Sequence, residues 1–288
     1  TVVPFTALIG FGLWNQWRSD QADAIQRALN EARLLAAQVD DHIGNLDNLM
    51  IGLSRAVSWD PADTIANDTL FRKIKAELPT FAANIMLFSP DGTNIGTSSD
   101  SGRFNASDRT YFLKALAGQR QSIGEAIHAR AGDRWVITVA HPVQDETGRV
   151  RAVLAVGTWL EHFQHAFSTA RLPPGSVVLV INQTGIVLAD SVNGPKWVGR
   201  NLSTVDHVPR HIAAKEISEI VRWDDNVNRI TGSATASLAP WLVSVGLPTD
   251  IAFVPVLRRL GWGALFTFVT LLMSSAIAWT VSGRIVSP

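Results

Sequence analysis

The sequence of 288 residues predicts an α+β fold: a long N-terminal helix, two tandem modules with antiparallel sheets, and flanking membrane-spanning helices. Three observations lead to this prediction. Apolar residues follow a heptad pattern near the N-terminus. A strand–turn–strand pattern occurs twice, about ninety residues apart, which indicates two related domains. An uncharged apolar run near the C-terminus is long enough to cross a bilayer.

The heptad pattern predicts a stalk helix over residues 18–59. Its apolar residues alternate three and four positions apart: Ile25, Leu29, Ala32, Ala36, Val39, Ile43, Leu46, Met50 and Leu53. Asp60-Pro61 ends the helix, because the residue before a proline avoids the helical basin. We expect the distal half of this seam to pack on its own domain. In the proximal half the small Ala32 and Ala36 suit close pairing with a second copy. We therefore expect a homodimer, formed through the stalk and the transmembrane helices.

Residues 60–170 form the predicted distal module. A helical patch ends at Pro79, and the turn Pro90-Asp91-Gly92 joins the first two strands. After these we expect a short helix, three strands and a closing helix, over residues 108–117, 122–129, 133–143, 149–158 and 159–170.

Residues 171–250 form the predicted proximal module, where the pattern restarts after Pro173-Pro174-Gly175. The expected elements are two strands, a helix and a closing hairpin, over residues 176–182, 186–190, 207–221, 229–236 and 241–247. From this order of elements we expect each module to form one antiparallel sheet with helices on one face.

Two segments predict membrane anchors. Leu260 to Val281 contains no charge, and at about 1.5 Å per residue it reaches roughly 33 Å, enough for a hydrocarbon core. We assign residues 251–284 to the second transmembrane helix and 285–288 to the start of a cytoplasmic linker. Residues 1–17 are interpreted as a truncated first transmembrane helix, with a signal-peptide core as the alternative. Both termini would then lie on the same side of the membrane.

One group of motifs resembles a known family. Asp108-Arg109-Thr110-Tyr111-Phe112, the strand ending Ala140-His141-Pro142-Val143, and the return Ala152 to Val156 after the Gly148 turn look like a double Cache (dCache) sensor. The resemblance implies PAS-like modules in the periplasm, held in a bacterial inner membrane, that sense a small molecule. It also implies a cytoplasmic transmitter: a histidine kinase of a two-component system first, with a diguanylate cyclase or a chemotaxis transducer as alternatives.

The candidate ligand residues come from the same resemblance. It implies that Arg109 pairs with a ligand carboxylate and that Tyr111, the single tyrosine, donates its hydroxyl. Arg103, Trp135, His141 and Thr158 complete the predicted site. Residues 103–134 carry six Lys or Arg against three acids, which favours a small organic anion. The alternative is that Asp108–Arg109 is an internal ion pair and that Tyr111 belongs to the core.

One position departs from the family pattern. Amino-acid-binding members carry an aspartate near the end of the returning strand, and Gly157 occupies that position here. An ammonium group buried without a carboxylate partner would be costly. We therefore predict a carboxylic acid, and not an α-amino acid, as the ligand.

Other function classes find little support in the sequence. A net charge of zero argues against binding nucleic acid through bulk electrostatics, and the lack of cysteine excludes thiol chemistry. Glu161, His162 and His165 lack a partner cluster at metal-ligand spacing, so we interpret them as a solvated helix face. No nucleophile–base or phosphate-binding motif suggests an enzyme within these residues, and no cofactor is expected. A structural module that binds nothing is the competing interpretation, above all for the proximal module.

Overall fold

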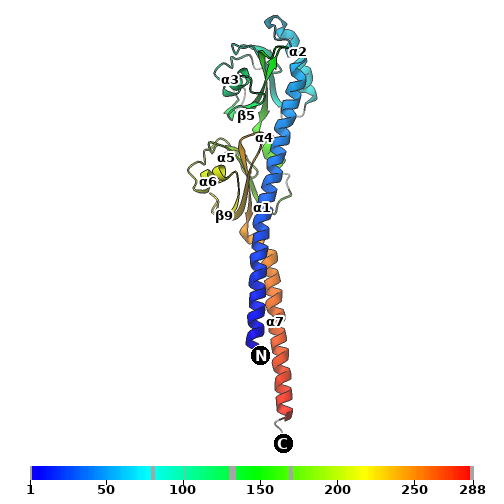
Figure 1. The fold of residues 1–288 in the computed structure, drawn as a ribbon, viewed down its shortest axis with the longest axis vertical. Coiled ribbons are helices and arrows are strands. Elements are labelled where there is room, and N and C mark those ends of the chain that lie inside the picture. The colour runs from blue at the N-terminus through cyan, green and yellow to red at the C-terminus, as the bar shows by residue number, and fades with distance from the viewer. Residues whose placement is uncertain (1, 79–81, 101, 130–133, 169–170, 286–288) are drawn as a thin grey trace.

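In the computed structural model, which describes residues 2–78, 82–100, 102–129, 134–168 and 171–285, the molecule is elongated. Helix α1 (Val2–Ser54) runs along nearly its whole length, and both sheets lie beside it (Figure 1). The N- and C-terminal helices extend together from one end, so the distal module is the one farther from the termini. The expected stalk helix is confirmed, but it ends at Ser54 and not at residue 59, so Asp60-Pro61 is not what ends it. Toward the N-terminus it continues through residues assigned to the first anchor.

The distal module is one antiparallel sheet with short helices around it. Its strands are β1 (Ala82–Phe88), β2 (Asn94–Thr97), β3 (Ser122–Ile123), β4 (Ile127–His128), β5 (Trp135–Gln144) and β6 (Val150–Trp159). The order is β2-β1-β6-β5-β3, and β4 also pairs with β5. The helices are η1 (Pro61–Asp63), α2 (Thr64–Glu77), α3 (Thr110–Leu116) and α4 (Leu160–Ser168). The strand expected over 122–129 is thus two two-residue strands, separated at Gly124.

The proximal module repeats this topology in a smaller sheet. Its elements are β7 (Val177–Asn182), β8 (Val187–Asp190), α5 (Gly194–Trp197), α6 (His207–Ala214), β9 (Glu216–Arg222), β10 (Asn228–Thr235) and β11 (Trp241–Pro248). The order β8-β7-β11-β10-β9 places each strand where its distal counterpart lies, so the repeat seen in the sequence is a repeat of the fold. The α+β prediction with two antiparallel sheets is confirmed.

The helix expected over 207–221 was wrong in its second half. Helix α6 ends at Ala214, and Lys215 follows with a left-handed φ of 62°, which breaks the helix. Residues Glu216 to Arg222 then form the edge strand β9, paired with β10. The β-branched residues Ile217, Ile220 and Val221 favour this extended conformation.

Helix α1 packs against strands of both modules, and its contacts with the proximal module are especially close. A Cβ atom on Gly232 of β10 would lie 2.2 Å from the carbonyl carbon of Ala28, so only glycine lets helix and strand approach this closely. The Asp40 carboxylate accepts hydrogen bonds from the backbone amides of Ser237 and Leu238, both at 2.7 Å. These contacts hold the β10–β11 hairpin on the stalk.

The heptad seam is buried within the chain from Ala32 to Leu53, whereas Ile25 and Leu29 are only partly buried. Its distal half packs on the modules, as expected, and Ala32 and Ala36 of its proximal half are 0% and 4% exposed. The proximal face that we expected to pair with a second copy is therefore covered by the chain's own sheet. A homodimer through the stalk and the transmembrane helices stays a prediction, and Ala32 and Ala36 are not available as its contact.

The two modules also contact each other directly. The ring of Trp135 lies against Gly199, where an added Cβ would lie only 2.0 Å from Cζ2 of the indole. Gly199 has a φ of 85°, which L side chains rarely adopt. The β4–β5 end of the distal module thus rests on the loop after α5.

The run Leu260–Val281 lies within one continuous helix, α7 (Thr249–Ile285), which leads directly out of β11. Across the described residues, no helix meets the length and hydropathy needed to traverse a membrane. The flanking transmembrane helices are therefore not confirmed and stay predictions.

Candidate functional site

The two faces of the distal sheet have different roles, because side chains alternate along each strand. One face packs on α1 and α2 and includes Ile85, Leu87, Ile137, Val139, Leu154 and Val156. The opposite face carries a second apolar cluster that includes Met86, Phe88, Ala140 and Tyr111. The candidate site lies on this second face, away from the stalk.

A cavity of about 590 Å³ opens there, within the range of pockets that hold small organic molecules. Its polar lining residues are Lys75, Asn84, Ser99, Arg103, Arg109, Tyr111, His128 and Thr138. The remaining lining is glycine or apolar: Ala83, Met86, Gly102, Phe104, Ile127, Ala129, Val136, Gly157 and Trp159. Three strong cations line this space, and no carboxylate does among the described residues.

Arg109 is the best placed of these cations to meet an anion. It precedes α3 in an extended conformation, and its side chain is 25% exposed at the cavity. Its partner is Asp108, at 3.5 Å between Nε and Oδ1, and the Asp108 side chain is 71% exposed. Such an exposed, long ion pair contributes little. No hydrogen bond joins the Arg109 guanidinium to any other described residue, so its donors remain available.

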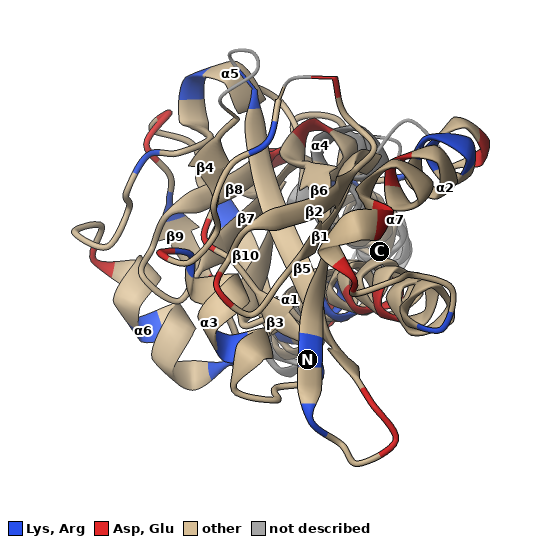
Figure 2. Ribbon diagram, turned by 90° about the horizontal axis from the view of Figure 1, so that it is seen from above, with Lys and Arg blue, Asp and Glu red and all other residues tan. Residues whose placement is uncertain are grey.

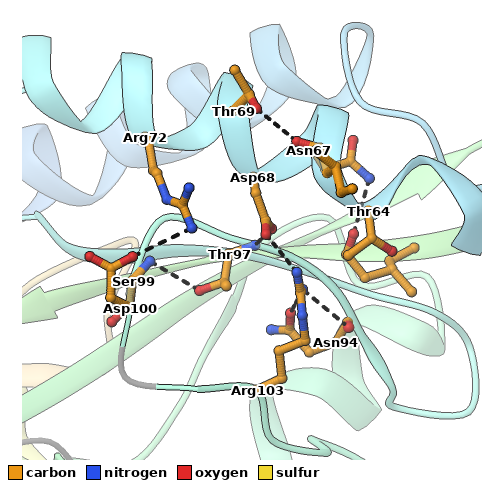
Figure 3. Close-up of polar contacts among 12 residues, drawn as sticks. Thr64, Asn67, Asp68, Thr69, Arg72, Asn94, Thr97, Ser99, Asp100 and Arg103 are labelled. Atoms are coloured by element: carbon orange, nitrogen blue, oxygen red, sulfur yellow. Dashed lines mark hydrogen bonds and ion pairs between the residues drawn. The ribbon is translucent and has the colours of Figure 1, made fainter.

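Arg103 is already engaged within the wall of the cavity. Its guanidinium lies 2.6 Å from the Asp68 carboxylate of α2 and donates to the Asn94 side-chain oxygen at 2.8 Å (Figure 3). Asp68 also accepts from the backbone amide of Thr97 at 2.8 Å. The charge of Arg103 is therefore compensated, and its contacts hold the loop after β2 against α2.

Tyr111 lies deeper, at the start of α3. The pKa of its phenol is raised to about 12, chiefly by burial; the Arg109 charge lowers this pKa and the Asp108 charge raises it, and both effects are smaller. The hydroxyl is therefore protonated at neutral pH and able to donate a hydrogen bond. Gly124 makes room for the ring, since a Cβ there would lie 2.9 Å from Cδ1 of Tyr111.

Two PAS-like sheets of the same topology lie along one long helix, and the distal sheet carries the cavity. The Cache domain family matches residues 18–256, which is most of the chain. This chain is a member of the Cache domain family.

Solved structures agree with this family at the level of the fold. The extracellular domain of rpHK1S-Z16, described as a histidine kinase, aligns with a TM-score of 0.70 and 18% identity, over 81% of this chain and 98% of that one. The ligand-binding domain of the Pseudomonas fluorescens chemoreceptor CtaA aligns with a TM-score of 0.65 and 15% identity, over 83% and 98%. The domain of Mlp24 gives 0.63 and 15%, over 83% and 98%. No curated protein matches the sequence.

Within this Cache protein, three of the six candidate residues line the cavity and three do not. Arg103, Arg109 and Tyr111 border it. Trp135, His141 and Thr158 point to the other face of the sheet, because the cavity takes alternate residues of β5 and β6 (Val136, Thr138, Gly157, Trp159).

The three side chains on the other face are buried or contact the stalk helix or the proximal module. His141 Nδ1 lies 2.9 Å from Asp47 of α1, which joins the distal sheet to the stalk. Thr158 is fully buried, and Trp135 contacts the proximal module. The binding roles of all six residues stay predictions.

Sequence reasoning missed Trp159, Asn84 and Lys75 at the cavity. The Arg134 guanidinium lies 4.0 Å from the Trp159 ring centroid and is itself paired with Glu161 at 2.7 Å, which holds the indole in place. Alternation in β6 could have identified Trp159 once Gly157 was assigned to the site. Nothing in the sequence pointed to Lys75, which lies in the last turn of α2.

The equivalent space in the proximal module is filled. Only about 10 Å³ remains between β7, β11 and α6, roughly room for one water molecule. The imidazole of His211 occupies the region and bonds Ser233 Oγ and Glu219 Oε1, each at 2.8 Å. The space around His211 is therefore too small to hold a ligand.

Proposed function

We propose that this Cache protein is the extracytoplasmic sensing region of a bacterial membrane receptor, and that its distal module binds a small organic anion through a carboxylate. One observation carries the proposal: a ligand-sized cavity lined by Lys75, Arg103 and Arg109, with no carboxylate among its described lining residues. Such a site favours an anion, since desolvated guanidinium and ammonium groups need negative partners.

Arg109 has the central role in this proposal. Its planar guanidinium can hold a carboxylate through two parallel hydrogen bonds. The Tyr111 hydroxyl donates to the same carboxylate, and Phe104 and Trp159 cover the apolar body of the ligand. Arg103 keeps the loop after β2 in place through Asp68.

Structural neighbours support a small-molecule ligand but differ in one respect. Mlp24 was solved with asparagine, the Campylobacter jejuni chemoreceptor Tlp3 with L-valine, and CtaA with L-isoleucine. Those ligands carry an ammonium group, which needs a carboxylate or several acceptors when buried. In this chain Gly157 borders the cavity and supplies no such charge. We therefore propose an acid without an ammonium group.

Matched pairs of compounds test this proposal on the 288-residue chain. L-valine is compared with isovalerate, and L-isoleucine with 3-methylpentanoate, because each pair differs only by the amino group. A ligand that binds only the folded state raises the melting temperature, by about 5 °C at a hundredfold excess over its Kd. We expect the deaminated acids to raise it and the amino acids to leave it nearly unchanged.

Variants localise the effect to the cavity. Arg109→Gln should abolish the ligand-dependent rise, whereas Arg120→Gln, which removes an equal charge from an exposed position outside the cavity, should preserve it. Micromolar affinity for an α-amino acid, or an acid response that survives Arg109→Gln, would contradict the proposal.

Membership of the Cache family also bears on the cytoplasmic domain that would receive the signal. We propose a cytoplasmic histidine kinase as the transmitter, with a chemotaxis transducer or a diguanylate cyclase as alternatives. Histidine kinase and chemoreceptor domains both occur among the structural neighbours, which supports the first two. The filled proximal module supports a structural role for that half, between the sensing cavity and the membrane.

A further inference from the structure

The positive charges around the distal cavity are not equivalent. Arg103 is compensated by Asp68 at 2.6 Å, and the Asp68 side chain is only 13% exposed. Arg109 has only the long contact to the exposed Asp108. Lys75 has no ion pair or hydrogen bond from its ammonium to any described residue. Two cations, Arg109 and Lys75, are therefore left for a ligand.

These two cations reach the cavity from opposite edges of the sheet. Helix α2, which ends just after Lys75, packs on β2 and β1 at one edge. Helix α3, which begins just after Arg109, packs on β5 and β3 at the other. Figures 1 and 2 show α2 and α3 on opposite sides of the distal module. Both side chains nevertheless line the same cavity.

The strands between these cations contribute apolar and aromatic side chains, together with the polar Asn84 and Thr138. Met86 and Val136 contribute from the central strands, and Trp159 contributes from the end of β6. A cation at each end, with a floor between them that is more apolar than polar, complements a molecule with an anion at each end of an apolar body. A monoanion would leave one of the two cations in the site without a negative partner.

We infer that the ligand of this cavity is a dicarboxylate with an apolar or aromatic body, held by Arg109 at one carboxylate and by Lys75 at the other. This inference rests on the proposed function, since it names the class of organic anion that the same site takes. Lys75 also lies in the last turn of α2, where a cation is favoured by the helix dipole whether or not a ligand binds. Its role in the site must therefore be read from ligand affinity and not from stability.

Calorimetric titration of the 288-residue chain with two matched pairs tests the inference. The pairs are adipate with hexanoate, and terephthalate with benzoate, so that each diacid is compared with a monoacid of the same body. A charge-assisted contact at the second carboxylate should make each responding diacid bind at least about tenfold tighter than its monoacid.

Three variants assign the second contact. Lys75→Gln should bring diacid affinity down to about that of the monoacid and change monoacid affinity by less than about twofold. Lys75→Arg should keep most of the preference for the diacid. Lys73→Gln is the matched control, because it removes the same charge from an exposed position of the same helix outside the cavity, and it should change neither affinity.

The possible outcomes separate this inference from the proposed function. If monoacids bind as tightly as diacids, or if Lys75→Gln behaves like Lys73→Gln, the dicarboxylate inference is overturned while anion binding stands. If Arg109→Gln weakens both classes and Lys75→Gln weakens only diacids, the inference is supported. If no acid of any class binds, the proposed function fails and this inference fails with it.

Discussion

At the residue scale, His42 is the titratable group whose pKa the fold lowers most clearly. It lies where α1 meets α4, with its ring centroid 5.0 Å from that of His162 and 4.9 Å from that of Phe163. Burial, together with a smaller effect of the nearby His162, lowers the pKa of His42 from 6.5 to about 4. The native stalk contact therefore favours the neutral imidazole.

This pKa predicts that the protein loses stability in mild acid. Below pH 6.5 the unfolded chain takes up a proton at His42 that the folded chain does not accept until about pH 4. The contribution is therefore fully present above pH 6.5 and is lost as the pH falls toward 4. We expect it to cost about 1–2 kcal/mol of unfolding free energy at pH 5, after allowing for partial exposure.

Denaturant unfolding at pH 8 and pH 5 measures this effect. His42→Leu removes the titrating group and should make the fall between the two pH values smaller than in the parent chain. The pKa of His207 is also lowered, mainly by burial, so some acid sensitivity should remain in the variant. Equal falls for parent and variant would show that His42 does not titrate as described.

At the scale of elements, the contact between α1 and β10 depends on the absence of a side chain. The backbone of Ala28 fills the place where a Cβ of Gly232 would be, and backbone cannot rotate away as a flexible side chain can. We expect Gly232→Ala to force the helix from the sheet and lower the free energy of unfolding by about 2–3 kcal/mol.

Gly52→Ala is the matched control for this substitution. Gly52 lies in α1, and a Cβ there would meet nothing within 4 Å. Alanine at such a helical position should raise the free energy of unfolding by about 0.5–1 kcal/mol. Chemical denaturation measures both free energies of unfolding. A decrease for Gly232→Ala with an increase for Gly52→Ala would locate the effect at the α1–β10 contact. An increase for Gly232→Ala would contradict the prediction.

At the scale of the whole molecule, two long helices leave the folded modules in the same direction. Helices α1 and α7 contact each other and extend past the proximal module, with both termini at that end (Figure 1). This arrangement fits the proposed membrane receptor, in which the modules lie outside and the ends lie on the other side of a membrane.

Reporter fusions in a bacterial host test that topology. Alkaline phosphatase inserted at Gly148, in an open hairpin turn where an added Cβ meets nothing within 4 Å, should be active, because it would lie in the periplasm. The same reporter joined after the last residue should be inactive, while a cytoplasmic fluorescent reporter there should be bright. Equal phosphatase activity at both positions would place them in one compartment and overturn the receptor proposal.

The sequence by itself determined the long helix, the strand–turn–strand units, the repeat and the family, because each depends on patterns between near neighbours in the chain. A heptad spacing or a Pro90-Asp91-Gly92 turn can be predicted without knowledge of distant contacts. Residues 216–221 were predicted as helix but form a strand. The helix ends because Lys215 takes a left-handed φ, which the residue type lysine does not predict.

Only the tertiary structure decided which side chains meet in the cavity. Arg109 and Tyr111 follow from a local motif, but Trp135, His141 and Thr158 face away, because sheet register and the position of α1 select one face of each strand. Lys75 joins Arg109 only because two helices at opposite edges of one sheet converge on the same space. Contacts between distant segments depend on packing, and no local pattern encodes them.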